Sequence, residues 1–283
     1  MAVQDLAKFD VLMPMAPWEE PAIVSMALES LEKQILQPSK VIISCDGPPP
    51  DSLRSVIAAC RLPVQVIEGP GREGVGPVLA RGMDYCQADL IIRADADDIS
   101  SPDRCLIQVR TMCQFPGIVA MSTWIEEFQG DPSEITSVRK VPIGTAKTRQ
   151  FSRWRNPLNH PAVILRRSIV NRVGGYRSCP GFEDYYLWLR LLKQGYIIDN
   201  IADPLVKARV GPDHTARRNG WSYLKAEGRF LWRCAHEELL EWPHAIGLAL
   251  LRLPVRLVPV PVQTWIMRTL LRGSSNQGSA GHP

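Results

Sequence analysis

Short apolar runs alternate with amphipathic stretches in the first half of the chain. The apolar runs at residues 9–15, 40–45, 64–67 and 89–93 end at Pro, Gly or Asp, as buried strands do. Between them, residues 21–36 and 52–60 carry apolar side chains at helical spacing, and a third helix is predicted to end at Cys86. Strands that alternate with helices predict an α/β fold whose sheet is mainly parallel.

The pattern is less regular after residue 101. It predicts a helix at residues 102–113, extended segments at 118–128 and 135–141, and a short strand at 162–166. After these it predicts a helix with an apolar stripe at 182–193 and a strand pair, or a strand and turn, at 196–209.

The C-terminal part of the chain mixes Leu, Ile and Val with arginine. Arginines stand at positions 252, 256, 268 and 272, and the longest uncharged stretch between them is far shorter than the ~20 residues that a spanning helix needs. Such a segment suits either helices packed on the catalytic domain or an element lying in a membrane interface. We therefore predict a catalytic domain at residues 1–215, a helical and membrane-associating extension at 216–272, and a disordered tail at 273–283.

Composition and charge narrow the class of protein. Apolar residues make up 45% of the 283 positions and charged residues 22%, which is typical of a globular protein. The net charge of +4 is too small to argue for nucleic-acid binding, so no nucleic-acid partner is expected. The seven cysteines show no metal-binding spacing, and Lys8 and Asp10 interrupt the N-terminal apolar run, so a cytoplasmic protein without a signal peptide or N-terminal anchor is predicted.

Three carboxylates follow the apolar strand at residues 89–93. Asp95, Asp97 and Asp98 lie within four residues, and such crowding is costly unless a cation neutralises it. Mg²⁺ or Mn²⁺ takes oxygen ligands of this kind together with phosphate oxygens. Asp97 is the expected direct ligand, Asp95 a metal or ribose contact, and Asp98 a cap of the following helix.

An acidic pair opens the apolar helix predicted at residues 182–193. Glu183 and Asp184 would be stabilised there by the helix dipole alone. They would also suit catalysis, with Asp184 as a general base for a sugar hydroxyl and Glu183 holding an acceptor hydroxyl.

Four further residues are candidates on weaker grounds. His160, in the turn-rich segment NPLNHP, either lines the acceptor side or is structural, and Asp46 either contacts the nucleoside or starts a turn. Arg72 lies in a glycine-rich loop that has neither the P-loop nor the dinucleotide-binding spacing, and it is a candidate substrate contact. His214, in a basic segment after the last strand, either completes a metal site or lies in an ordinary loop.

Taken in order, the motifs resemble family 2 glycosyltransferases over about residues 9–220. They are VLMP, SLEKQ, CDGP, a GxG before a helix, RADADDISSPDR, NHPAVILRRS, VGGYR and FEDYYLWLRL. The chain departs from that family in having Ala16-Pro17-Trp18 after the first strand and Tyr186 in place of a further Asp. These departures concern the nucleobase contacts and the acceptor contacts respectively.

The resemblance implies a GT-A fold: a Rossmann-like mixed, mainly parallel sheet flanked by helices, with a C-terminal helical appendage. It implies an inverting, metal-dependent hexosyltransferase of bacterial surface-polysaccharide synthesis. The donor would be a nucleoside-diphosphate sugar, with UDP the expected nucleotide, and the acceptor a glycan or lipid-linked glycan at the cytoplasmic face of the inner membrane. Nucleotide contact at Asp46, ribose and metal contacts at Asp95 and Asp97, and the base at Asp184 follow from the same resemblance.

Two other functions are compatible with the sequence. A sugar nucleotidyltransferase uses a similar sheet and metal, but it needs a glycine-rich basic signature after the first strand, where this chain has Ala16-Pro17-Trp18. A catalytically silent carbohydrate-binding or scaffold protein would not need both Asp97 and Asp184.

Overall fold

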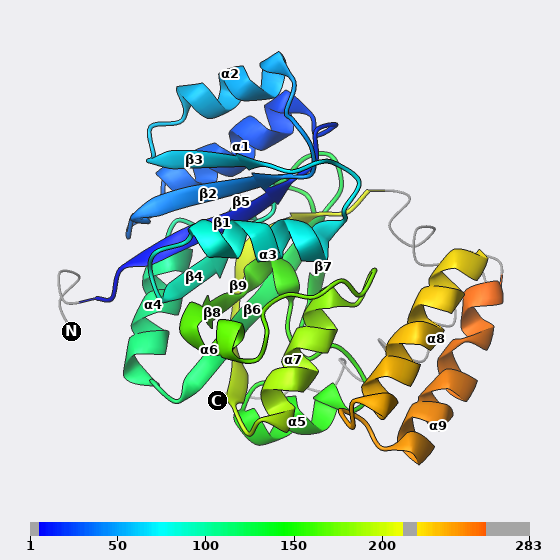
Figure 1. Ribbon diagram of the computed structural model, residues 1–283. Helices are drawn as coiled ribbons and strands as arrows, with labels where there is room; N and C mark the ends of the chain where they lie inside the picture. The colour runs from blue at the N-terminus through cyan, green and yellow to red at the C-terminus, as the bar shows by residue number, and fades with distance from the viewer. Residues whose placement is uncertain (1–5, 212–219, 259–283) are drawn as a thin grey trace, which may run out of the picture. The chain divides into compact units, whose positions relative to one another are not determined.

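The computed structural model describes residues 6–211 and 220–258. The chain divides into two compact units, Met1–Val210 and Gly211–Pro283 (Figure 1). The first unit contains one large mixed sheet with helices on both faces, and the described part of the second unit is helical.

The first four strands are parallel neighbours in the order β3-β2-β1-β4. Their bounds are β1 (Phe9–Met15), β2 (Lys40–Cys45), β3 (Val64–Glu68) and β4 (Leu90–Arg93). The helices between them are α1 (Pro21–Glu32), α2 (Asp51–Ala59) and α3 (Val75–Tyr85). Every residue of β1 is buried, as expected of a central strand covered on both faces. The predicted α/β alternation is confirmed, although α1 ends at Glu32, four residues before the predicted end.

The rest of the sheet is mixed. Its strands are β5 (Ile99–Ser100), β6 (Ile118–Phe128), β7 (Ile135–Arg139), β8 (Ile164–Arg166) and β9 (Ile197–Arg209). Its helices are α4 (Arg104–Gln114), α5 (Thr145–Ser152), η2 (His160–Ala162), α6 (Arg167–Arg172) and α7 (Glu183–Lys193), η2 being a 3-10 helix. Strand β8 runs antiparallel to both β4 and β6, whereas β6 and β9 are parallel.

The prediction of a strand pair or a strand and turn at residues 196–209 is wrong. The structure has a single strand there, β9, paired along nearly its whole length with β6. Asp203 and Pro204 have the composition of a turn, but they lie where the register between β6 and β9 shifts, and such bulges accommodate proline inside a sheet.

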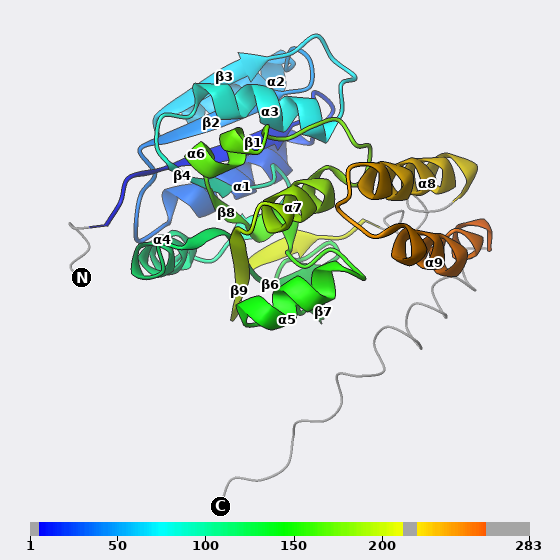
Figure 2. The ribbon, with the colours of Figure 1, turned by 60° about the horizontal axis from the view of Figure 1, so that its bottom comes forward.

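Two apolar clusters hold helices to the two faces of the sheet (Figure 2). Val11 and Met13 of β1 face one cluster, which includes residues from α1, α2 and α4. Leu12, between them, faces the other, which includes residues from α3, α6 and α7. The alternation along one strand therefore fixes α7, with its acidic first turn, on the same face as α3.

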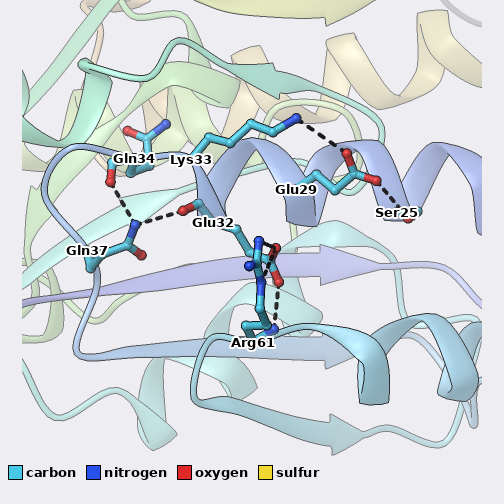
Figure 3. Close-up of polar contacts among 7 residues, drawn as sticks. All are labelled: Ser25, Glu29, Glu32, Lys33, Gln34, Gln37 and Arg61. Carbon is cyan, nitrogen blue, oxygen red and sulfur yellow. Dashed lines mark hydrogen bonds and ion pairs between the residues drawn. The ribbon is translucent and has the colours of Figure 1, made fainter.

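Figure 3 shows polar contacts along α1 and with the segments that follow α1 and α2. Arg61 donates to the Glu32 carboxylate from its backbone nitrogen at 2.6 Å and from its guanidinium, and these bonds lower the pKa of Glu32. Gln37 donates to the Glu32 carbonyl oxygen at 2.9 Å. No candidate site residue lies among these contacts, which join α1 to the loop after α2.

The second unit contains a buried charge cluster. Its elements are α8 (Gly220–His236), α9 (Trp242–Arg252) and the 3-10 helix η5 (Pro254–Leu257). Glu227 of α8 is fully buried and accepts from Arg252 at 3.2 Å and from Arg256 at 2.7 Å. The sequence pattern suggests that these arginines flank a membrane-facing surface, but the structure engages both with Glu227.

Within residues 6–211 and 220–258, no helix is long and apolar enough to span a membrane. No disulfide joins any of the seven cysteines, all of which the structure describes, and five of them are buried.

Candidate active site

Three carboxylates gather directly after β4. Ligand oxygens of Asp95, Asp97 and Asp98 lie within 4.8 Å of one another. Burial first, and then the charge of Asp95, raise the pKa of Asp97. The same causes, with Asp97 added, raise the pKa of Asp98 well above its ordinary value. The fold therefore brings together three carboxylates whose simultaneous ionisation is unfavourable.

Asp98 is not the helix cap predicted from the sequence. Helix α4 begins only at Arg104, and the Asp98 carboxylate instead accepts from the backbone nitrogen of Arg209 at 2.9 Å. Strand β5 and the turn after it separate Asp98 from α4. The Asp98 side chain instead belongs to the carboxylate cluster and anchors the end of β9 there.

Arg93 is the protein's own countercharge for this cluster. Its guanidinium binds Asp95 through both terminal nitrogens, at 2.5 and 2.9 Å. Arg93 is itself buried, and its backbone oxygen accepts from the buried Arg104 at 2.6 Å. Arg104 also donates to the Pro161 oxygen at 3.1 Å, and burial lowers the pKa of Arg104 to about 10. The arginine pair thus ties the carboxylate loop to η2.

Asp46 and the glycine-rich loop meet at the ends of β2 and β3. The Asp46 carboxylate accepts from the backbone nitrogens of Glu73 and Gly74, at 2.9 and 3.2 Å. Gly47 and Gly71 have positive φ, and a Cβ on Gly47 would lie 3.4 Å from the Gly71 Cα, so the two loops touch through their backbones. Arg72 is exposed on this loop, with φ of 60°. The Asp46 carboxylate therefore holds the backbone of the glycine-rich loop in place.

Asp184 lies in the first turn of α7, held by neutral donors. One carboxylate oxygen accepts from the Tyr185 backbone nitrogen at 2.7 Å, and the other accepts from the Asn156 side chain at 2.5 Å. The Asn156 oxygen in turn accepts from the Leu158 nitrogen at 3.3 Å, which orients the amide. His160 Nδ1 lies 4.0 Å from the same Asp184 oxygen that binds Asn156.

His160 is a partly buried, neutral side chain in this arrangement. Its Nε2 lies 3.0 Å from the Tyr176 hydroxyl, and the Trp188 ring packs edge-on against it. Burial first, and then the positive charge of Arg93, hold the pKa of His160 well below its ordinary value. Burial likewise raises the pKa of Tyr176. His160 is therefore suited to orienting a neighbour by hydrogen bonding and not to carrying charge.

Glu183 packs against the start of α3. A Cβ on Gly76 would come within 2.8 Å of Glu183 Cγ and 3.1 Å of the Arg177 carbonyl oxygen, so a side chain at this position would have to displace Glu183. Burial raises the pKa of Glu183, as does the neighbouring Asp184, while Arg93 lowers it. Arg93 thus acts electrostatically on Glu183 and His160 as well as on Asp97 and Asp98, which brings the two groups of residues into one site.

Most of the predicted site residues therefore lie together in the first unit, with two qualifications. Arg72 is exposed on the glycine-rich loop, and His214 falls outside the described residues. Tyr186 is fully buried with the Arg190 guanidinium 4.6 Å from its ring, whereas Trp18 is 72% exposed.

Sequence reasoning missed Arg93, Asn156 and Tyr176. Arg93 carried a signal, because a charged residue that ends an otherwise apolar buried strand needs a partner. Asn156 and Tyr176 lie in segments that were singled out for other residues, and nothing in their spacing pairs them with Asp184 or His160.

Comparison with known proteins decides the family. The family model described as glycosyl transferase family 2 matches residues 17–174. The chain belongs to glycosyl transferase family 2. The chain is therefore a glycosyltransferase, and the family assignment excludes the nucleotidyltransferase alternative.

Two relatives of this family 2 glycosyltransferase are similar over most of their length. One is the Escherichia coli UDP-Gal:alpha-D-GlcNAc-diphosphoundecaprenol beta-1,3-galactosyltransferase, 33% identical over 270 residues, covering 95% of this chain and 98% of the relative. The other is the amylovoran biosynthesis glycosyltransferase AmsE of Erwinia amylovora, 33% identical over 221 residues, covering 77% and 82%.

Solved structures share the GT-A fold. The mannosyltransferase PcManGT from Pyrobaculum calidifontis, in complex with GDP-Man and Mn²⁺, superposes with a TM-score of 0.64 at 16% identity, covering 98% of this chain and 78% of that one. Staphylococcus aureus TarS in complex with UDP-GlcNAc gives 0.61 at 15% identity, covering 86% and 70%. The predicted fold class is confirmed.

Proposed function

We propose that this protein transfers a hexosyl group from a nucleoside-diphosphate sugar, with UDP as the expected nucleotide, to a hydroxyl of a lipid-linked sugar, inverting the anomeric configuration. The observation that carries the proposal is that the site has two separate carboxylate regions. Asp184 is held by Asn156, whereas the cluster of Asp95, Asp97 and Asp98 is bound by Arg93. The similar E. coli enzyme, whose name specifies a UDP-sugar and a diphosphoundecaprenol-linked acceptor, supports the substrate classes.

Asp184 is the proposed general base. Its carboxylate takes the proton of the acceptor hydroxyl as the hydroxyl oxygen forms a bond to the anomeric carbon, and the bond from that carbon to the diphosphate oxygen breaks. Attack from the face opposite the leaving group inverts the configuration without a covalent intermediate. Glu183 and His160 are proposed to position the acceptor hydroxyl, and Asp46 and Arg72 to contact the donor nucleotide.

The carboxylate cluster fits a divalent cation. Asp97 and Asp98, with raised pKa values, and Asp95 supply hard oxygen ligands close together, which is the donor set that Mg²⁺ or Mn²⁺ takes alongside phosphate oxygens. Such an ion, when bound, stabilises negative charge on the departing diphosphate. Because Arg93 engages both oxygens of Asp95, Asp97 and Asp98 are the better placed pair of ligands.

A transfer assay tests this proposal. The wild-type protein is offered UDP-, dTDP- and GDP-sugars with a sugar-diphospho-lipid acceptor, with Mn²⁺ or Mg²⁺ or with EDTA, and donor binding is followed separately by thermal shift. We expect transfer from one donor class, loss of transfer in EDTA, and a product whose anomeric configuration, read by proton NMR, is opposite to that of the donor. Retention of configuration, or full activity in EDTA, would contradict the mechanism.

We further propose that the second unit binds the cytoplasmic face of the membrane through α9. Trp242, Ile246 and Leu250 are spaced four residues apart, and each is at least half exposed. The arginines near them are engaged with Glu227, so binding should depend mainly on apolar insertion and only weakly on salt. Replacing Ile246 and Leu250 with Ser should release the protein from vesicles; undiminished binding, also after deletion of residues 242–283, would refute this.

A further inference from the structure

The hydrogen bond between His160 and Tyr176 joins two backbone segments that buried side chains hold in place. Tyr176 follows the turn after α6, where the buried Arg190 guanidinium of α7 donates to two carbonyl oxygens, at 2.6 and 2.5 Å. His160 begins η2, and the buried Gln108 of α4 donates to a carbonyl oxygen of η2 at 2.7 Å. Both rings therefore stand on backbone whose position is fixed by other parts of the fold.

The two ring nitrogens of His160 face different groups. Nε2 lies 3.0 Å from the Tyr176 hydroxyl oxygen, and Nδ1 lies 4.0 Å from a carboxylate oxygen of Asp184. Because burial and the charge of Arg93 hold the pKa of His160 well below its ordinary value, the ring is neutral and carries one N–H. That N–H points either toward Tyr176 or toward Asp184, and the other nitrogen is a hydrogen-bond acceptor.

The surroundings of the ring favour a proton on Nδ1. Among the residues that the structure describes, the buried Tyr176 hydroxyl has His160 as its only hydrogen-bond partner, so its own proton finds an acceptor only if Nε2 is unprotonated. With the proton on Nε2, the hydroxyl proton would have no acceptor, and the Nδ1 lone pair would face the negative Asp184 oxygen. Both ends of the ring therefore select the same tautomer.

We propose that Tyr176 is a positioning residue that holds His160 as the Nδ1–H tautomer, and that this N–H donates to the acceptor hydroxyl at Asp184. The inference rests on the proposed function, in which Asp184 takes the proton of that hydroxyl. Two atoms 4.0 Å apart can both lie within about 3 Å of one oxygen atom. The hydroxyl oxygen then accepts from Nδ1–H and donates to Asp184, and its second lone pair is left for attack on the anomeric carbon.

Heteronuclear NMR of the imidazole nitrogens tests the tautomer without turnover, because protonated and unprotonated ring nitrogens differ in chemical shift. The full-length protein is used, and the His160 signals are those missing from the variant His160→Asn. We expect Nδ1 to carry the proton in the wild type at neutral pH. Tyr176→Phe should lower the fraction with Nδ1–H, because Nε2 loses its donor. A wild-type ring protonated on Nε2, or the same tautomer fraction in Tyr176→Phe, would overturn the proposal.

Transfer kinetics separate positioning from a purely structural role of Tyr176. Tyr176→Phe should lower kcat about tenfold with KM for the donor unchanged, the effect of losing one hydrogen bond that orients the acceptor. Tyr196→Phe is the matched control, because Tyr196 packs against the same apolar cluster and its hydroxyl meets only Arg172, at 3.4 Å, among the described residues. It should transfer as the wild type does. An equal loss in this control, or a raised KM for the donor in Tyr176→Phe, would overturn the proposal.

Two replacements of His160 distinguish its nitrogens. The amide nitrogen of asparagine takes about the place of Nδ1 and that of glutamine the place of Nε2, so His160→Asn should retain more transfer than His160→Gln. In the His160→Asn background Tyr176→Phe should cause no further loss, because Tyr176 acts through the imidazole. Additive losses would overturn the proposal. If the wild type transfers sugar to no acceptor, the proposed function fails, and the NMR measurement still decides the tautomer.

Discussion

The two carboxylate regions of the site differ in how their charge is satisfied. Asp184 has a backbone donor and the Asn156 amide, both neutral and in place. The cluster of Asp95, Asp97 and Asp98 has Arg93 paired with Asp95 and the charge of Arg209 nearby, yet the pKa values of Asp97 and Asp98 remain raised. A region already satisfied is suited to proton transfer in a fixed geometry, whereas a region short of positive charge is suited to binding a cation and its phosphate ligand.

The largest effect that would sharpen this comparison is expected from Asp97→Asn. Removing the ligand charge should lower transfer by roughly 10³-fold, because the stabilisation that a cation gives to a leaving diphosphate is worth several kcal/mol. Titration of the nucleotide in the presence of Mn²⁺ should show the loss as weakened binding. Asp103→Asn is the control and should behave as wild type, because the Asp103 carboxylate lies outside the cluster and accepts from the Ser101 hydroxyl.

The second largest effect is expected from Arg93→Gln, which should lower the free energy of unfolding. The substitution leaves the partly buried Asp95 without its countercharge, and breaking such pairs costs about 3 kcal/mol or more. Chemical denaturation of the metal-free protein measures this loss, and Mn²⁺ should restore part of it. Arg93→Lys should be milder. If Arg93→Gln unfolds at the wild-type denaturant concentration, Arg93 is not the countercharge that we assign.

Asp98→Asn should have a smaller effect of opposite sign. The asparagine oxygen can still accept from Arg209, but the crowded charge is removed. We expect the metal-free variant to be more stable than the metal-free wild type at neutral pH, because the crowded negative charge is gone. Because the folded pKa is raised, the wild type should lose stability as pH rises through that pKa, and the variant should lose less. Parallel pH profiles of unfolding would contradict this.

Gly76→Ala should have the smallest effect, confined to the acceptor side. The new Cβ would press on Glu183 and the Arg177 oxygen, so we expect transfer to fall about threefold with donor binding unchanged, as for a side chain displaced by a few tenths of an ångström. Gly82→Ala, on the same helix, meets the core side chains Leu12 and Ser44 instead, so it should lower stability. An effect of Gly76→Ala on donor binding would break the division between the two regions.

Much of the fold could be predicted because local patterns agree with it. The bounds of β1, β2 and β6 match the predicted segments to the residue. The grouping of three carboxylates after β4 could also be predicted, because all three lie in one short segment of the sequence. Helices α5 and α6 were not predicted, because they have only eight and six residues and carry little periodicity.

The contacts of the site were harder to predict. Arg93 with Asp95 is a local pair, but its link through Arg104 to Pro161 depends on how β4 and η2 meet in space. The pairing of Asn156 with Asp184 joins residues 28 positions apart, across a bend that no periodicity reports. Asp98 was predicted as a cap because a helix follows it, and only the fold turns it toward Arg209.

One measurement tests the central claim most directly: nucleotide binding and sugar transfer by Asp184→Asn, measured in the same preparation with Mn²⁺. We expect donor binding within about twofold of the wild type and transfer lowered by roughly 10³-fold, since a general base contributes about 10²–10⁴. Residual transfer near the wild-type rate would remove Asp184 from its role. Lost donor binding would show that the two carboxylate regions do not act separately.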